Sequence, residues 1–253
     1  MTELIHVDTL HPEIRTLLTQ YCRQMLEIHQ GNLRSILVYG SAAGDHYLHR
    51  RSNINLMFIF QNLPFSTLKD SLKIISSGRK KRILAPLFLT EEYIISSSDA
   101  FPVEFLDIKE NHITLYGEDI FQRLEINQMN LRLQCEQEIK GKLIRLRQSY
   151  LEAGLRKKHL EALLSQSLNS LMPTFRCIMH LKGYLLSQPM SREEIIGTLA
   201  GDFQIPKETL LTVLHIKAGK LRLDKSELEA VLSNFLDALQ KLAQSIDQLS
   251  IRT

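Results

Sequence analysis

The hydrophobic pattern of the first half of the chain predicts strands that alternate with helices. Residues 12–29 carry apolar side chains at the spacing of an amphipathic helix. Short runs rich in branched and aromatic residues follow, and turn residues bound them, so they predict buried strands. The expected strands are residues 35–40, 54–60, 84–90 (at an edge or starting late because of Pro86), 101–108 and 112–117. The expected helices are residues 66–78, capped by Ser66, and 90–99, capped by Thr90.

From about residue 125 onward no strand pattern remains, and leucine recurs with helical periodicity. The expected helices are residues 131–155, residues 157–186 with Pro173 as a kink, one opened by the capping box Ser191–Glu194, one with Pro206 in its first turn, and residues 224–251. The sequence therefore predicts an α+β protein. A mixed sheet with flanking helices is expected over residues 1–120, and an all-helical bundle over residues 121–253.

Composition narrows the class of protein. Of the 253 residues, 44% are hydrophobic and 23% are charged, which is typical of a folded globular chain. A formal net charge of +3 is too small to indicate nucleic acid as a partner, and no segment is apolar for the roughly 20 residues that cross a bilayer. The first residues lack a signal-peptide pattern, and the distant Cys22, Cys135 and Cys177 predict free thiols. We therefore expect a cytoplasmic protein.

Candidate chemistry lies where the first predicted strand ends. Gly40 allows a sharp turn, and Ser41 with the amides behind it, followed by Gly44, would form an anion site at the start of a helix. Asn53 and Asn55 open the next strand and lie on one face of it, because strand side chains alternate. Two carboxylates at those positions would hold one cation beside a bound phosphate.

This arrangement resembles the nucleotidyltransferase superfamily, whose signature is a strand, Gly-Ser, about a dozen residues and then Asp-hydrophobic-Asp. The small bacterial members related to aminoglycoside adenylyltransferases, which carry a helical C-terminal domain, are the most similar in pattern. The resemblance covers about residues 33–121 and implies Mg²⁺ and a nucleoside triphosphate. It also implies a third carboxylate on a later strand, for which Glu104 in "PVEFL" is the first candidate and Asp107 the second.

The departure from that signature predicts the function. Asn53-Ile54-Asn55 stands where the resemblance implies two acids, and an asparagine offers a metal a carbonyl oxygen without charge. We therefore expect a degraded metal site. Cofactor binding would be limited to a weakly held Mg²⁺ with a nucleoside triphosphate. The protein would then be a pseudoenzyme, which either binds a nucleotide weakly or acts as a regulatory or interaction module.

Two alternatives stay open at this point. An active nucleotidyltransferase would move a nucleoside monophosphate onto a hydroxyl of a small molecule or protein, with Glu104 and either Asp107 or Asp45 holding the metal. Asp45, His46 and His49 are otherwise interpreted as exposed loop residues. The many leucine stripes of the helical half also favour a homodimer through that domain.

Overall fold

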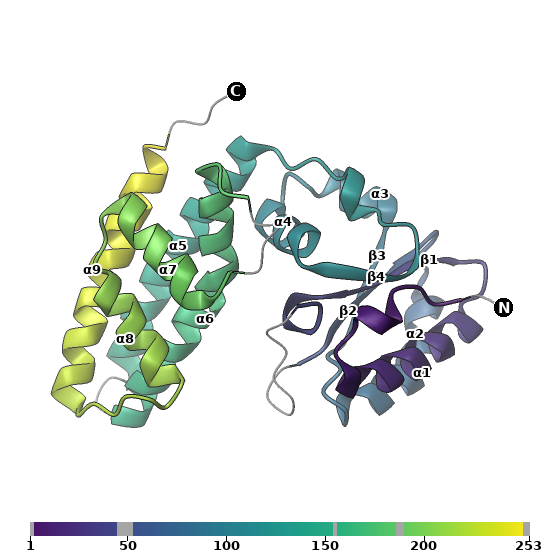
Figure 1. The fold of residues 1–253 in the computed structure, drawn as a ribbon, viewed down its shortest axis with the longest axis horizontal. Helices are drawn as coiled ribbons and strands as arrows, with labels where there is room; N and C mark the ends of the chain where they lie inside the picture. The colour runs from purple at the N-terminus through teal and green to yellow at the C-terminus, as the bar shows by residue number, and fades with distance from the viewer. Residues whose placement is uncertain (1–2, 45–52, 154–155, 186–189, 250–253) are drawn as a thin grey trace. The chain divides into compact units, whose positions relative to one another are not determined.

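The computed structural model describes residues 3–44, 53–153, 156–185 and 190–249. These residues form two compact units, one of residues 1–101 with 105–126 and one of residues 102–104 with 127–253. The first unit combines a sheet with helices and the second is helical (Figure 1). The α+β class predicted from the sequence is confirmed.

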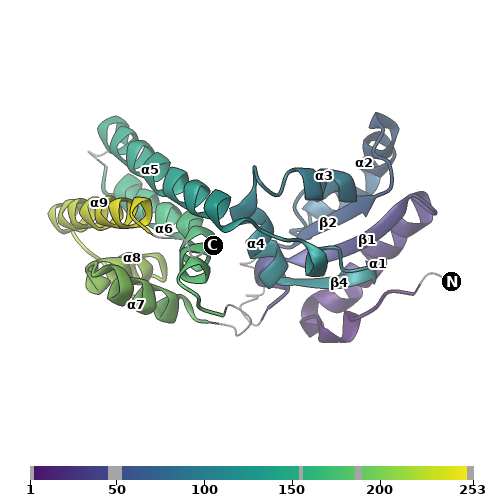
Figure 2. The ribbon, with the colours of Figure 1, turned by 90° about the horizontal axis from the view of Figure 1, so that it is seen from above.

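The sheet of the first unit is mixed and has the strand order β3-β2-β1-β4, so β1 lies between β2 and β4 (Figure 2). β1 pairs antiparallel with β2 and β4, and β3 pairs parallel with β2. β3 is an edge strand, as Pro86 predicts. The strands are β1 (Leu33–Tyr39), β2 (Asn55–Phe60), β3 (Leu87–Thr90) and β4 (His112–Gly117).

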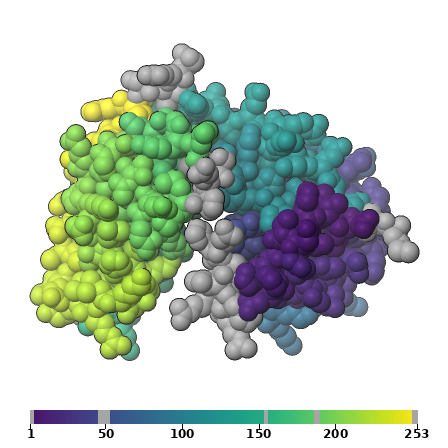
Figure 3. Space-filling view, in the orientation of Figure 1, coloured from purple at the N-terminus to yellow at the C-terminus, as the bar shows by residue number. Residues whose placement is uncertain are grey.

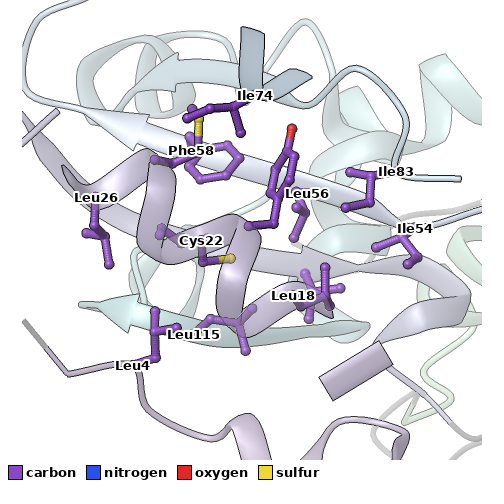
Figure 4. Close-up of a cluster of buried hydrophobic side chains, with 14 of the residues drawn as sticks. Leu4, Leu18, Cys22, Leu26, Ile54, Leu56, Phe58, Ile74, Ile83 and Leu115 are labelled. Carbon is purple, nitrogen blue, oxygen red and sulfur yellow. The ribbon is translucent and has the colours of Figure 1, made fainter. Parts of the chain in front are cut away.

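Each face of the sheet is buried by helices. On one face, α1 (Pro12–Ile28) and α2 (Phe65–Arg79) pack over side chains such as Leu56 and Phe58 (Figure 4). On the other face, Leu37, Met57 and Ile59 pack with side chains from α3 (Glu91–Ser96), α4 (Pro102–Glu110) and the short 3-10 helix η3 (Phe121–Arg123). Burial on both sides explains why residues 36–39 of β1 and 56–60 of β2 are apolar without alternation. Thr90 caps α3 as predicted, because its hydroxyl accepts from the Tyr93 amide.

Two predictions in this half are wrong. Residues 101–108 form most of α4 and not a strand. Pro102 occupies the first helical position, where its missing N–H costs nothing, and a short apolar run fits a buried helix as well as a strand. Ser66 does not cap α2, because the helix begins one residue earlier and Pro64 is the residue at its N-cap.

The second unit contains the five helices expected from the leucine pattern. Ser191 and Glu194 form the predicted capping box. Pro206 is the N-cap of its helix and not part of the first turn. In the part of the chain that the structure describes, no helix is both long and apolar enough to cross a membrane. The helices are α5 (Gln128–Ala153), α6 (Lys157–Leu181, with Pro173 inside it), α7 (Arg192–Phe203), α8 (Lys207–Lys217) and α9 (Lys225–Asp247).

Candidate functional site

The turn after β1 is built around Gly40. Gly40 has φ +69°, in the left-handed region, and its amide donates to the Asn111 carbonyl over 3.0 Å. A Cβ at this position would lie 3.2 Å from Asn55 Nδ2. The left-handed backbone conformation favours glycine here, and an added Cβ would also crowd the end of the Asn55 side chain, which confirms the sharp turn predicted from the sequence. Ser41, the next residue, is exposed, whereas Ala42 is buried.

The helix expected behind Ser41 is shorter than predicted. Residues 40–42 form a single 3-10 turn, named η2. One turn aligns few peptide dipoles, so any attraction to a phosphate must come mainly from local N–H groups and the Ser41 hydroxyl. Gly44 is exposed, and a Cβ added there meets no described atom within 4 Å, so sterics do not require glycine at that position.

The sheet brings Asn55 to this turn. Asn55 pairs with Tyr39, the last residue of β1, and is half-buried. Asn53 is exposed and lies two residues earlier, on the far side of the Ile54–Ile83 bridge. The structure therefore groups Gly40, Ser41 and Asn55, while the phosphate and metal roles of these positions stay predictions.

Glu104 lies elsewhere. It is in the first turn of α4, and its carboxylate accepts from Gln134 Nε2 of α5 over 2.7 Å. The premise that Glu104 lies on a later strand is wrong, because that segment is helical. Neither β3 nor β4 contains an acidic residue. Neither of the described strands β3 and β4 therefore supplies the third carboxylate that the resemblance implies.

Asp107 is the acid that the structure brings toward the turn. Its carbonyl and carboxylate oxygens accept from Asn111 Nδ2 at 3.0 Å and 3.3 Å, and the carbonyl of Asn111 is the acceptor for Gly40. Burial and the nearby negative charge of Asp107 raise the pKa of Tyr39. The second choice made from the sequence thus contacts Asn111, the residue that bonds to the turn.

A histidine–aspartate pair next to the turn was missed from the sequence. His112, the first residue of β4, pairs with Tyr39 in the sheet. Its Nε2 lies 3.0 Å from Asp119 Oδ1, and its Nδ1 lies 2.9 Å from the Ile108 carbonyl oxygen. Only 8% of the His112 side chain is exposed, and its ring packs beside that of Phe121. Because both ring nitrogens face acceptors, the pair fixes the ring at the edge of the sheet.

The described side chains around the turn fit a magnesium ion poorly. Within the described residues, no group of three or more His, Cys, Asp and Glu side chains could hold a metal ion. Two neutral amides with the single carboxylate of Asp107 are a poor ligand set for Mg²⁺, which gives up water reluctantly and prefers carboxylates. Asp45, His46 and His49 lie outside the described residues.

Comparisons with known proteins support the fold. No protein-family model matches the chain, and a search of curated protein sequences found no match. A similar solved structure is the crystal structure of spectinomycin adenyltransferase AAD(9) from Enterococcus faecialis with ATP and spectinomycin. The TM-score is 0.56 at 11% sequence identity, and the match covers 89% of this chain and 99% of that one. The first unit thus has a nucleotidyltransferase-like fold and is followed by a helical unit.

Proposed function

We propose that this protein has kept the nucleotidyltransferase fold but not efficient transfer, and that it binds a nucleotide weakly as a regulatory module. One observation carries the proposal: asparagine occupies positions 53 and 55, where the resemblance implies two acids, and Asn55 pairs with Tyr39, the residue before the Gly40 turn. The fold supports a nucleotide ligand, because the similar AAD(9) structure contains ATP.

A bound metal contributes more to transfer than to nucleotide binding. A divalent cation between carboxylates and a triphosphate stabilises the charge of the transition state by several kcal/mol. At about 1.4 kcal/mol for each tenfold change in rate, losing that term slows transfer by roughly a thousandfold or more. Binding of the phosphates does not require the metal, since backbone N–H groups and a hydroxyl can contact an anion without it.

Calorimetric titration with ATP, in EDTA and in Mg²⁺, tests the proposal. We expect weak binding whose affinity is equal within about twofold in the two buffers, because Mg²⁺ gains no protein carboxylate. Ser41→Ala is expected to weaken binding about fivefold by removing one hydrogen bond. Ser66→Ala, at another exposed serine of the same unit, is the control and should leave the affinity unchanged. Tight binding that depends on Mg²⁺ would contradict the proposal.

The position of Asp107 favours the active enzyme as a second candidate. If Asp107 held a metal with other groups, ATP binding would require Mg²⁺, and Asp107→Asn would remove that requirement. Transfer of a nucleoside monophosphate to an acceptor would then be expected, which radiolabelled ATP would detect. Metal-independent binding that is unchanged by Asp107→Asn rules against this candidate.

We also propose a homodimer formed through the helical unit. Exposed apolar side chains follow one face of α5, where Leu133 is 48% exposed, Ile144 57% and Leu151 84%. The double change Leu133→Glu with Ile144→Glu should convert a particle of twice the 29.2 kDa chain mass to one of a single chain in light scattering. Leu72→Glu on α2, which is also exposed, is the control. A wild-type monomer at micromolar concentration would refute the dimer.

A further inference from the structure

Helix α2 of the first unit packs its small and polar residues inward, although a surface helix usually packs its apolar side chains there. The Ser71 hydroxyl donates to the Thr67 carbonyl over 2.8 Å and lies 2.8 Å from His29 Nε2. A Cβ at Gly78 would lie only 2.8 Å from Tyr21 Cε2, so α2 packs closely against α1, which is among the dark purple surface of Figure 3. The buried residues of α2 are Thr67, Ser71, Ile74 and Gly78.

The large apolar side chains of α2 face solvent instead. Phe65 is 78% exposed, Leu68 40% and Leu72 60%, and Ile75 is half-buried. These four positions recur three and four residues apart, so they form one stripe along the helix, named here the α2 stripe. The same spacing forms the seam where one helix packs against another. The described part of the chain leaves this seam open.

Positive charge gathers beside the α2 stripe. Residues 65–84 contain six basic residues and one acidic residue, a net charge of +5, whereas the whole chain carries +3, so the rest of the chain carries −2. The ion pairs found among the described residues include none of these six cations, which leaves their charge available to a partner. The cations are Lys69, Lys73, Arg79, Lys80, Lys81 and Arg82, and all are exposed.

These two features limit what can cover the α2 stripe. Two copies of it would bring two net charges of +5 together, and like charges repel. A membrane surface requires no helical seam, and it suits cations spread along the whole polar face of a helix. Here four of the six cations gather at residues 79–82, at and just after the end of α2.

A second helix fits both the seam and the charge. Its large apolar side chains would repeat at the spacing of the α2 stripe, and its acids would lie at the end that meets residues 79–82. Acidic residues are most favourable in the first turn of a helix. The first turn meets the end of α2 when the two helices are antiparallel.

We propose that the α2 stripe binds an acidic amphipathic helix of a partner protein, antiparallel to α2, with acids in its first turn and large apolar side chains against Phe65, Leu68 and Leu72. The stripe would give this protein a protein partner whose binding does not depend on a nucleotide at the Gly40 turn.

Fluorescence anisotropy with three designed peptides tests the surface. The first is a helix of about 15 residues with glutamates in its first turn and leucines three and four residues apart. The second has lysines in place of the glutamates, and the third has the first peptide's composition with the leucine spacing scrambled. We expect the first peptide to bind at least about tenfold more tightly than either of the others. Added salt should weaken its binding, because exposed charges are screened.

Two variants address the seam and the charge separately. Leu72→Glu should weaken binding of the first peptide at least about tenfold, because it places a carboxylate in the apolar contact. Lys80→Glu with Lys81→Glu should weaken the first peptide about tenfold and strengthen the lysine peptide. All three side chains are exposed, so circular dichroism should show an unchanged fold.

Matched controls lie in the second unit. Leu151→Glu on α5 changes an 84% exposed leucine, and Lys158→Glu with Lys220→Glu makes the same change in charge at two exposed lysines. Neither control should alter the affinity for the first peptide.

The outcomes separate this partner from other ligands and from the proposed function. Equal binding of the three peptides, or an unchanged affinity in Leu72→Glu, overturns the proposal. Binding of the unaltered chain to phosphatidylserine vesicles or to a single-stranded oligonucleotide, without binding of the first peptide, also overturns it. ATP binding by a chain that ignores all three peptides would leave the proposed function standing and remove the partner helix alone.

Discussion

Restoring both carboxylates, through Asn53→Asp with Asn55→Asp, is expected to make nucleotide binding depend on magnesium. Asn55 pairs with Tyr39, the residue before Gly40, and Asn53 is exposed two residues earlier, so we expect two acids at these positions to face phosphates bound at the turn. Mg²⁺ would then bind carboxylates and phosphates together. We expect the affinity for ATP to rise about tenfold or more when Mg²⁺ replaces EDTA, a gain of about 1.4 kcal/mol for each factor of ten.

A second readout of this variant is thermal stability. Two carboxylates close together repel each other, so the variant should melt below the wild-type protein in EDTA and recover when Mg²⁺ is added. Asn127→Asp with Asn169→Asp adds the same two charges in the helical unit, at exposed positions, and should show neither effect. An unchanged ATP affinity in Mg²⁺ would mean that positions 53 and 55 do not face the bound phosphates.

The parts of the fold that depend on local pattern were predictable. Residues 36–39 of β1 and 56–60 of β2 are short apolar runs, and the capping box at Ser191 and the leucine stripes of the helical unit act within one or two turns of chain. The conformation of Gly40 was also predictable, because a sharp turn before a polar residue favours glycine. α4 was not, since its nine residues are too few for periodicity to distinguish a helix from a buried strand.

The rest of the candidate site depends on contacts between distant residues. The place of His112 beside Tyr39 follows from the register of β4, which shifts between Ile36 and Leu37 of β1. The N-terminal segment lies along β4 because the Ile5 amide donates to the Leu115 carbonyl, more than a hundred residues later. The spacing of residues along the chain does not predict such contacts. The same limit explains why Glu104 was preferred to Asp107, since a strand and a helix direct these two side chains differently.

Gly117 links the fold to the candidate site, because it lies in β4, the strand that begins with His112. It ends β4 at φ +75°, and a Cβ there would lie 1.9 Å from the Arg34 carbonyl oxygen. On either side of it, the Tyr116 and Glu118 carbonyls accept from Ser35 Oγ at 3.0 Å and 2.8 Å. The Arg34 carbonyl oxygen belongs to the backbone of β1, so no side-chain rotation can relieve its contact with a Cβ at position 117. Glycine at position 117 is therefore required by the approach of two strands.

Gly117→Ala is expected to lower the free energy of unfolding by about 3 kcal/mol or more, since backbone strain and a backbone clash act together. In a chain of this size, that loss corresponds to a fall of roughly 10 °C in Tm by scanning calorimetry. Gly183→Ala separates the two causes. Gly183 has φ +88° with no described atom within 4 Å of an added Cβ, so its variant should lose only about 1 kcal/mol. Equal losses in the two variants would show that strain alone acts at Gly117. β4 would then not depend on its close approach to β1 for the positions of His112 and Thr114.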